Sequence, residues 1–163
     1  MKAGHIRKTE MKSCSLCHRS LPSSAFYMRT DGRQYGNLSS RCKECVKLES
    51  KQSTIRFPEK AMVGAAKHRA KKAWLPFDLD AYRSEIRARI EAGVCELTGL
   101  PFAIGGDRDW NSPSIDRIEP ELGYVYSNVR IILWSLNSAF GYWGEDQFEI
   151  VARAWLERKS TPC

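Results

Sequence analysis

The stretch that decides the fold is Ser114-Ile-Asp-Arg-Ile-Glu-Pro120, followed by Gly123-Tyr124, Ser127-Asn-Val-Arg-Ile-Ile-Leu-Trp134 and Asn137-Ser-Ala-Phe-Gly141. Two short runs rich in β-branched residues, 114–118 and 128–134, predict two strands. Gly123 lies in the connection between them, where a turn is expected. A short helix is expected to begin around Ser135. The order of these elements predicts a compact ββα unit.

Polar side chains in this stretch suit a divalent cation. Asp116 on the first strand and Asn137 on the helix offer a carboxylate and an amide oxygen from opposite sides. Mg²⁺ prefers oxygen ligands and keeps several waters, so two protein ligands suffice. Alternatives stay open, because Asp116 can pair with Arg117 or Arg130 and Asn137 can cap the helix. Asn128 is expected to fix the turn by hydrogen bonds to the backbone.

The same segments resemble the HNH (ββα-metal) endonuclease motif over roughly residues 93–145. That family has an Asp followed by a catalytic residue on the first strand, a central Asn that opens the second strand, and an Asn or His early in the helix. The matching positions here are Asp116, Arg117, Asn128 and Asn137. The resemblance is to phage-type enzymes, which place a four-Cys zinc knuckle upstream. It implies a DNA endonuclease with catalytic Mg²⁺ or Mn²⁺ at Asp116 and Asn137, which leaves a 5′-phosphate and a 3′-hydroxyl.

Arg117 departs from the family pattern, in which a His general base directly follows the first Asp. Arginine stays protonated at any working pH and is therefore a poor proton acceptor. Either the nuclease is inactive, or the base comes from elsewhere and Arg117 clamps the phosphate. His68, in a basic predicted helix, is the candidate base, with a solvated surface His as the alternative. Arg69, Lys71 and Lys72 of that helix, together with Arg117, are expected to contact DNA.

Four of the six cysteines form two Cys-x2-Cys pairs, Cys14 with Cys17 and Cys42 with Cys45, separated by 24 residues. Each pair lets two thiolates converge from one tight turn, and two pairs complete a tetrahedral Zn²⁺ site. Disulfides are the alternative, but a cytosolic chain disfavours them. A closed four-thiolate shell leaves no position for a substrate, so the predicted zinc is structural. His18 is expected to lie beside this site without binding the metal.

The two remaining cysteines have no partner at ligand spacing. Cys95 is expected to be a small buried residue and Cys163 a terminal thiol. Some HNH relatives bind another zinc beside the ββα unit, but Thr98 stands where a partner cysteine would be. No second zinc is therefore expected, and hydrophobic packing of three tryptophans is expected in its place: Trp110, Trp134 and Trp143.

Three further helices are predicted. Pro58 stands at a plausible first helical position of a helix that runs to about Ala73. A second helix is expected over 80–92, and a last amphipathic helix over 145–158, with Phe148, Val151 and Trp155 facing inward. Residues 51–57 are interpreted as a polar linker. The predicted domains are a zinc-knuckle region with a basic arm at 1–57, and a helical connector with the nuclease module at 58–163.

The charge of this chain of 163 residues is uneven. Residues 1–90 hold 20 Lys and Arg against 8 Asp and Glu, whereas residues 91–163 hold 6 against 11. A basic half favours contact with phosphates, although basic charge alone is weak evidence for nucleic acid. No segment is apolar over the roughly 18 residues that a membrane span requires. The N-terminus has no apolar signal region, so the cytoplasm is the expected location, that of the host if the protein is phage-encoded.

These observations predict an α+β protein: a small zinc knuckle, then basic helices, then a ββα-metal nuclease module. DNA is the expected partner, no membrane is expected, and a homodimer is the assembly left open. The alternative function is a non-catalytic, zinc-containing DNA-binding protein with a decayed HNH fold. Arg117 favours that alternative, and the combination of Asp116, Asn128 and Asn137 favours the enzyme.

Overall fold

The computed structural model describes residues 10–29, 37–105, 108–141 and 143–160. The chain forms two compact units, Met1–Ser53 and Thr54–Cys163, and the boundary lies inside helix α1 (Lys43–Arg56). The predicted linker is therefore wrong over residues 51–56, which complete α1. No Gly or Pro interrupts the chain between Lys43 and Phe57, and the helix ends where Pro58 disfavours helical geometry in the residue before it. The division into domains at 57/58 stays a prediction.

The first unit consists of two small antiparallel hairpins and α1. The strands pair as β1 (Met11–Ser13) with β2 (Ser20–Pro22), and as β3 (Phe26–Met28) with β4 (Leu38–Cys42). A short 3₁₀ helix, η1 (Ser23–Ala25), lies between the hairpins, and β4 leads directly into α1. The buried core of this unit is small and consists of Phe26 and three cysteines, Cys14, Cys42 and Cys45. Most of the predicted basic arm, residues 1–9, lies outside the described part of the chain.

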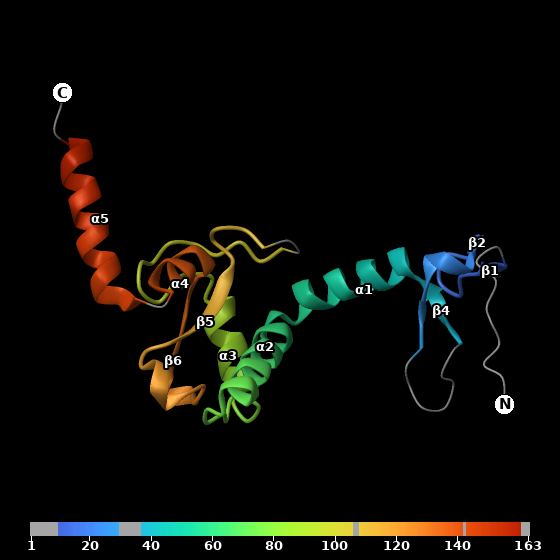
Figure 1. The fold of residues 1–163 in the computed structure, drawn as a ribbon, viewed down its shortest axis with the longest axis horizontal. Coiled ribbons are helices and arrows are strands. Elements are labelled where there is room, and N and C mark those ends of the chain that lie inside the picture. Colours follow the sequence, from blue (N-terminus) through green and yellow to red (C-terminus); the bar gives the residue numbers. More distant parts are fainter. Residues whose placement is uncertain (1–9, 30–36, 106–107, 142, 161–163) are drawn as a thin grey trace. The chain divides into compact units, whose positions relative to one another are not determined.

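The second unit contains the predicted ββα arrangement (Figure 1). Strands β5 (Pro113–Arg117) and β6 (Val129–Leu133) are antiparallel, with Ile115 opposite Ile131 and Asp116 opposite Arg130. Two 3₁₀ turns, η2 (Pro120–Leu122) and η3 (Tyr126–Asn128), lie in the connection, and α4 (Trp134–Phe140) follows β6 directly. Both strands and the short helix are thus confirmed to within a residue or two. The structure is an α+β protein, as the sequence predicts.

Two helices pack against the β5–β6 hairpin: α2 (Pro58–Ala73) and α3 (Arg83–Glu91). The predicted start of α2 at Pro58 is confirmed, whereas α3 begins three residues later than expected, after a turn. Alternation along each strand sends every second side chain into this core, which is where Ile115 and Ile131 lie. The core also contains the buried helix residues Val63, Ala66, Ala70, Ile86 and Ile90.

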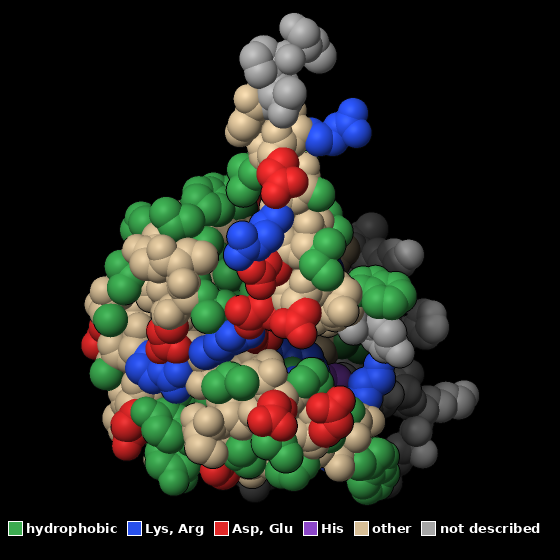
Figure 2. All heavy atoms as spheres, turned by 90° about the vertical axis from the view of Figure 1, so that its left-hand side faces the viewer, with side chains coloured by type: hydrophobic (Ala, Val, Ile, Leu, Met, Phe, Trp, Pro, Cys, Tyr) green, Lys and Arg blue, Asp and Glu red, His purple; other side chains and the backbone are tan. Residues whose placement is uncertain are grey.

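The last helix, α5 (Gly144–Ser160), does not bury the face that the sequence predicts. Val151 and Trp155 are 66% and 60% exposed, and of the three expected residues Phe148 alone packs against a core cluster. The Phe148 ring meets that of Phe140 edge-on, with centroids 5.5 Å apart. Figure 2 shows hydrophobic side chains exposed on the face of the molecule that carries α5. The amphipathic period is present, but only the first turns of the helix reach the rest of the unit.

The predicted tryptophan cluster is also wrong. Trp110 and Trp143 are exposed and Trp134 is half-exposed, and among the described residues none of the three belongs to a buried core cluster. The buried cluster next to β6 and α4 consists instead of Ile132, Leu133, Phe140 and Cys95. Ile132 points to the opposite side of β6 from Ile131, which packs with α2, and Leu133 closes the end of the strand. The prediction of a buried Cys95 is confirmed, and Cys163 lies outside the described residues. Within the described residues, no helix is both long and apolar enough to cross a bilayer.

Candidate functional site

Asp116 belongs to an ion-pair network on the β-hairpin that is centred on Arg130. Its Oδ2 accepts a hydrogen bond of 2.8 Å from Nε of Arg130, the residue directly opposite on β6. The other side of the Arg130 guanidinium lies 2.8 Å from a Glu145 carboxylate oxygen at the start of α5. Burial alone lowers the Arg130 pKa, but the hydrogen bonds to the two carboxylates outweigh it and raise the pKa. The pairing with Arg130 that the sequence left open is therefore present.

Asn137 ties α4 to β5 instead of capping the helix. Its Nδ2 donates to Ser114 Oγ at 2.8 Å and to the Ile115 carbonyl at 3.1 Å. The helix begins at Trp134 after Leu133 at the cap position, so the alternative of Asn137 as an N-cap is wrong. Among the described residues, neither Asn137 Oδ1 nor Asp116 Oδ1 has a hydrogen-bond partner. Each of the two expected ligands therefore keeps one oxygen for a further contact.

Asp116 and Asn137 line the same cavity, which has a volume of about 340 Å³. Three arginines reach this cavity, Arg69 from α2, Arg108 from the loop before β5, and Arg117 from β5 itself. A carboxylate and an amide oxygen surrounded by guanidinium groups form a surface that suits a cation bound together with a phosphate. The tertiary fold thus brings together four of the predicted site residues, Arg69, Asp116, Arg117 and Asn137.

Arg117 is held at the rim of this cavity. Its Nη1 donates to the Pro120 carbonyl at 2.8 Å, and its guanidinium carbon lies 4.9 Å from the centroid of the Tyr124 ring. Stacking on the ring and one backbone hydrogen bond leave the remaining N–H groups of the guanidinium for an anion. This placement suits a phosphate clamp, the role that the sequence assigns to Arg117 in an active enzyme.

Tyr124 is a member of the site that sequence reasoning missed. The residue is buried, lines the cavity, and accepts a hydrogen bond of 2.8 Å on its hydroxyl from Nε of Arg69. Its position depends on Gly123, where a Cβ would lie 2.5 Å from the Pro76 carbonyl oxygen. That close approach lets Tyr124 form a bridge with Phe77. The available signal was the Gly123-Tyr124 pair, which marks a close backbone approach next to an aromatic side chain.

Asn128 fixes the turn between the strands, as predicted. The side chain is buried, and its Oδ1 accepts from the Glu119 backbone N–H at 3.0 Å. Its Nδ2 donates to the Glu119 carbonyl at 2.8 Å and to the Gly123 carbonyl at 2.9 Å. These bonds use the polar groups of Asn128 on the backbone, so its part in the site is to shape the turn that carries Tyr124.

His68 lies on α2 but does not line the cavity that holds Asp116. Its side chain is exposed, and the next residue, Arg69, is the one that α2 directs into the cavity. Lys71 and Lys72 are exposed in the last turn of the same helix. The structure therefore does not bring His68 together with the two expected metal ligands.

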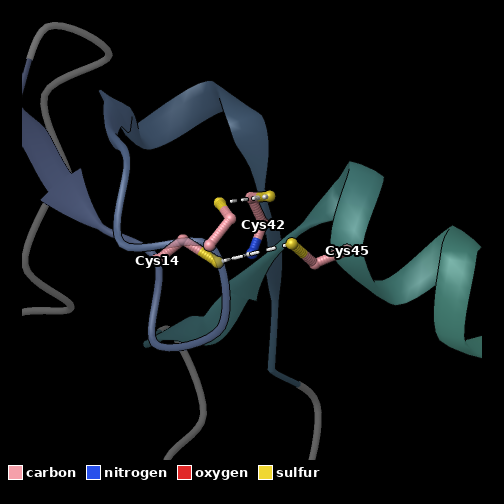
Figure 3. A group of neighbouring side chains, drawn as sticks. Cys14, Cys42 and Cys45 are labelled. Carbon is pink, nitrogen blue, oxygen red and sulfur yellow. Dashed lines mark hydrogen bonds between the residues drawn. The ribbon is translucent and has the colours of Figure 1, made fainter.

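The four cysteines of the first unit converge into one cluster (Figure 3). Their sulfurs all lie within 4.8 Å of one another, with Cys14 Sγ 3.8 Å from Cys45 Sγ and Cys17 Sγ 4.0 Å from Cys42 Sγ. Backbone N–H groups of Cys17 and Cys42 lower the pKa of Cys14 to about 5, whereas burial raises the pKa of Cys45 to about 12. Four thiols at this spacing fit a tetrahedral Zn²⁺, which would displace the thiol protons.

No family model and no curated protein sequence matches this chain. Among solved structures, the rare-cutting HNH restriction endonuclease PacI is similar to it with a TM-score of 0.32 and 15% sequence identity. The matched region covers 91% of this chain and 99% of that one. A similarity this low carries no argument about the site.

Proposed function

We propose that this chain is a metal-dependent DNA endonuclease of the HNH type. It would hydrolyse a phosphodiester bond and leave a 5′-phosphate and a 3′-hydroxyl. The observation that carries the proposal is that Asp116 and Asn137 share one cavity with three arginines. Among the described residues, Asp116 and Asn137 each keep one side-chain oxygen without a hydrogen-bond partner. Two hard oxygen ligands suit a divalent cation, and guanidinium groups suit phosphate oxygens. Together they favour a phosphate ester as the substrate.

The donor set fits a hard cation such as Mg²⁺ or Mn²⁺. Arg130 occupies Oδ2 of Asp116, so the carboxylate would bind the ion through Oδ1 alone. Asn137 would contribute Oδ1, because its nitrogen is committed to β5. Two protein ligands are in keeping with Mg²⁺, which keeps several waters. When bound, the ion would neutralise the charge that develops on the phosphate and the leaving oxygen.

The chain's own cations would position the scissile phosphate. Arg117 and Arg69 both line the cavity, and their guanidinium carbons lie 4.9 Å and 5.2 Å from the centroid of the Tyr124 ring. Guanidinium groups bind phosphate oxygens in a bidentate manner, which fixes the orientation of the ester before the reaction. Arg130 acts through Asp116 and is a positioning residue.

Two side chains compete for the role of proton acceptor. His68 remains the proposal from the sequence, and it requires that DNA pass over the exposed face of α2. Tyr124 is the proposal from geometry, because its hydroxyl lies in the cavity and already accepts a hydrogen bond from Arg69. General-base help is worth about 10²–10⁴-fold. Cleavage rates of His68→Ala and Tyr124→Phe against pH decide between them, since only loss of the true base reduces the rate on that scale and alters the profile.

A plasmid-nicking assay with Mg²⁺ and with EDTA tests the proposed activity. Asp116→Ala and Asn137→Ala should each abolish cutting and leave DNA binding largely intact, because each removes a ligand and not the phosphate clamp. Asn111→Ala is the matched control, since this amide lies outside the cavity that holds Asp116. Cutting by Asp116→Ala or Asn137→Ala at the wild-type rate would show that the ligand assignment is wrong.

A non-catalytic, zinc-containing DNA-binding protein with a decayed HNH fold is the second candidate. The Arg130–Asp116 ion pair favours it, because a guanidinium group already neutralises the carboxylate that would bind the metal. Arg117 in place of a base favours it as well. DNA binding that is the same with Mg²⁺ and without added divalent cations, without cutting in Mg²⁺ or Mn²⁺, would support this candidate over the enzyme.

A further inference from the structure

We propose that a second cavity, beside the candidate active site, binds the base of one unpaired nucleotide. The substrate would then be DNA in which a base next to the scissile phosphate is unstacked, and not a regular duplex. This inference rests on the proposed nuclease function, because it names the substrate class of the same site. It stands on the shape, the lining and the charge of the second cavity.

The second cavity has a volume of about 270 Å³ and adjoins the cavity that holds Asp116. Met62 and Ala65 of α2 form part of its wall, and Ile104 and Pro113 contribute from the loop before β5 and from the strand itself. The two cavities share a set of lining residues, Arg69, Arg108, Ser114, Ile115 and Trp134. The two cavities therefore lie side by side and share part of their walls.

The distance between Ser114 and Asp116 along β5 matches the distance between a phosphate and a neighbouring base of one ligand. Ser114 lines both cavities, whereas Asp116 lines only the one proposed as the active site. The two residues are two positions apart, so their side chains point to the same side of the strand about 6.6 Å from each other. A nucleotide whose phosphate lies at Asp116 is thus aligned to place a neighbouring base against the wall at Ser114.

The lining of the second cavity suits a flat, neutral group and not a phosphate. Aliphatic side chains form most of its wall, and among the described lining residues no Asp or Glu is present. Its cationic residues, Arg69 and Arg108, are shared with the active-site cavity. Drug-sized ligands occupy roughly 300–1,000 Å³. This smaller space therefore favours a single base, with the attached phosphates near the arginines.

Trp134 supplies a stacking surface between the two cavities. Its side chain is 37% exposed, although its backbone is fixed at the start of α4 by a 2.7 Å hydrogen bond from its N–H to the Ser112 carbonyl. The guanidinium carbon of Arg108 lies 5.6 Å from the ring centroid. A half-exposed indole with a stacked arginine is the kind of surface on which an unpaired base stacks. A base inside a duplex is covered by its neighbours and does not reach such a cavity.

The test compares binding of three DNAs by the zinc-loaded full chain in buffer without Mg²⁺ or Mn²⁺, where no cutting interferes. One is a regular duplex, one carries a single unpaired 2-aminopurine, and one carries an abasic residue at the same position. We expect the unpaired base to bind roughly 5- to 150-fold more tightly than the abasic residue, the range that stacking of one base gives. The fluorescence of the unpaired 2-aminopurine should fall when the protein binds.

Matched variants locate the effect. Trp134→Ala should remove the preference for the unpaired base, and Trp134→Phe should restore much of it because a ring is retained. Trp110→Ala is the control, since Trp110 is exposed and lines neither cavity. Ala65→Leu narrows the second cavity from an exposed position on α2, and it should reduce the preference while the Trp134 ring remains.

The outcomes separate this inference from the proposed function. A preference that depends on Trp134, in a protein that cuts no DNA in Mg²⁺, would support the base site and contradict the nuclease. Cutting in Mg²⁺ with equal affinity for the unpaired base and the abasic residue would overturn the base site and leave the nuclease. No binding of any of the three DNAs would overturn both.

Discussion

Asn128 is a single side chain that determines the geometry of the connection between β5 and β6. Its three hydrogen bonds join the backbone of Glu119 and Gly123, positions that are nine and five residues away. Asn128→Ala would leave these buried backbone groups without partners, each at a cost of about 1–3 kcal/mol, partly relieved by water. We expect a loss of about 2–4 kcal/mol in the free energy of unfolding of the second unit, measured by urea denaturation.

Asn111→Ala is the control for that measurement. The Asn111 side chain makes a single 3.3 Å hydrogen bond to the Pro101 carbonyl at an exposed site, so its loss should cost less than about 0.5 kcal/mol. Equal effects of the two substitutions would contradict the role assigned to Asn128.

Glu96 couples stability to pH. Its carboxylate accepts two hydrogen bonds of 2.7 Å from Arg89 and one of 2.8 Å from the Ile131 backbone N–H on β6. Burial raises its pKa, but these hydrogen bonds outweigh burial and lower the pKa below 4.5. A lowered folded-state pKa gives a stabilisation that is present above pH 4.5 and lost as the pH falls through the folded-state value.

The substitution Glu96→Gln tests this coupling. Glutamine can still accept the Ile131 N–H but no longer forms the ion pair with Arg89. The variant should therefore be less stable than wild type at neutral pH, and the difference should shrink below pH 4.5. Thermal unfolding measured over a series of pH values gives the comparison. A difference that stays constant down to strong acid would mean that the ion pair contributes nothing.

At the level of single elements, α5 shows that residues of one amphipathic face differ in burial. Trp155 is 60% exposed, whereas Phe148 on the same stripe packs edge-on against Phe140. Trp155→Ala should change the free energy of unfolding by less than about 0.5 kcal/mol, and Phe148→Ala should cost more than about 1 kcal/mol. Denaturation by urea measures both. A large loss in Trp155→Ala would indicate that another surface covers the end of α5 in solution.

The first unit is an element whose folding depends on its cysteines. Among its described residues, the buried core contains one large side chain, Phe26, beside the sulfur cluster, which is too little to hold two hairpins alone. We therefore expect one Zn²⁺ per chain by elemental analysis. Cys42→Ser should lose the metal and unfold the first unit, seen as loss of backbone amide protection there. Acid should release the metal, because protons compete with it for the thiolates.

Ser39→Ala is the control for the zinc prediction, since Ser39 lies on β4 near Cys42 and carries no sulfur. Freshly purified protein without stoichiometric zinc would contradict the assignment of the cluster.

At the scale of the whole molecule, the question is which basic residues meet DNA. Arg69 and Arg117 line the candidate site, whereas Lys71 and Lys72 lie exposed on α2 outside it. If α2 follows the DNA backbone, replacing both lysines by alanine should flatten the slope of log K against log salt by roughly one to two units. Filter binding over a series of salt concentrations measures the slope. An unchanged slope would show that this face of α2 does not contact DNA and would remove the support for His68.

The order and kind of the elements around the site could be predicted from local sequence patterns. Proline, glycine and alternating apolar residues act through local interactions, so they located α2, both strands of the hairpin and α4 to within a few residues. The spacing of the four cysteines likewise predicted that their sulfurs converge: Cys14 and Cys17 lie in one turn, and Cys42 at the end of β4 is followed by Cys45 in the first turn of α1. Asn128 was assigned to the turn for the same reason.

Only the tertiary structure decided which groups meet across these elements. The pairing of Asp116 with Arg130 depends on the register of two strands, and that of Tyr124 with Arg69 joins residues 55 positions apart. The exposure of Val151 and Trp155 depends on where α5 leaves the unit, which its own period does not encode. Contacts of this kind arise from the packing of distant segments, and a local pattern carries no information about the partner that a side chain will find.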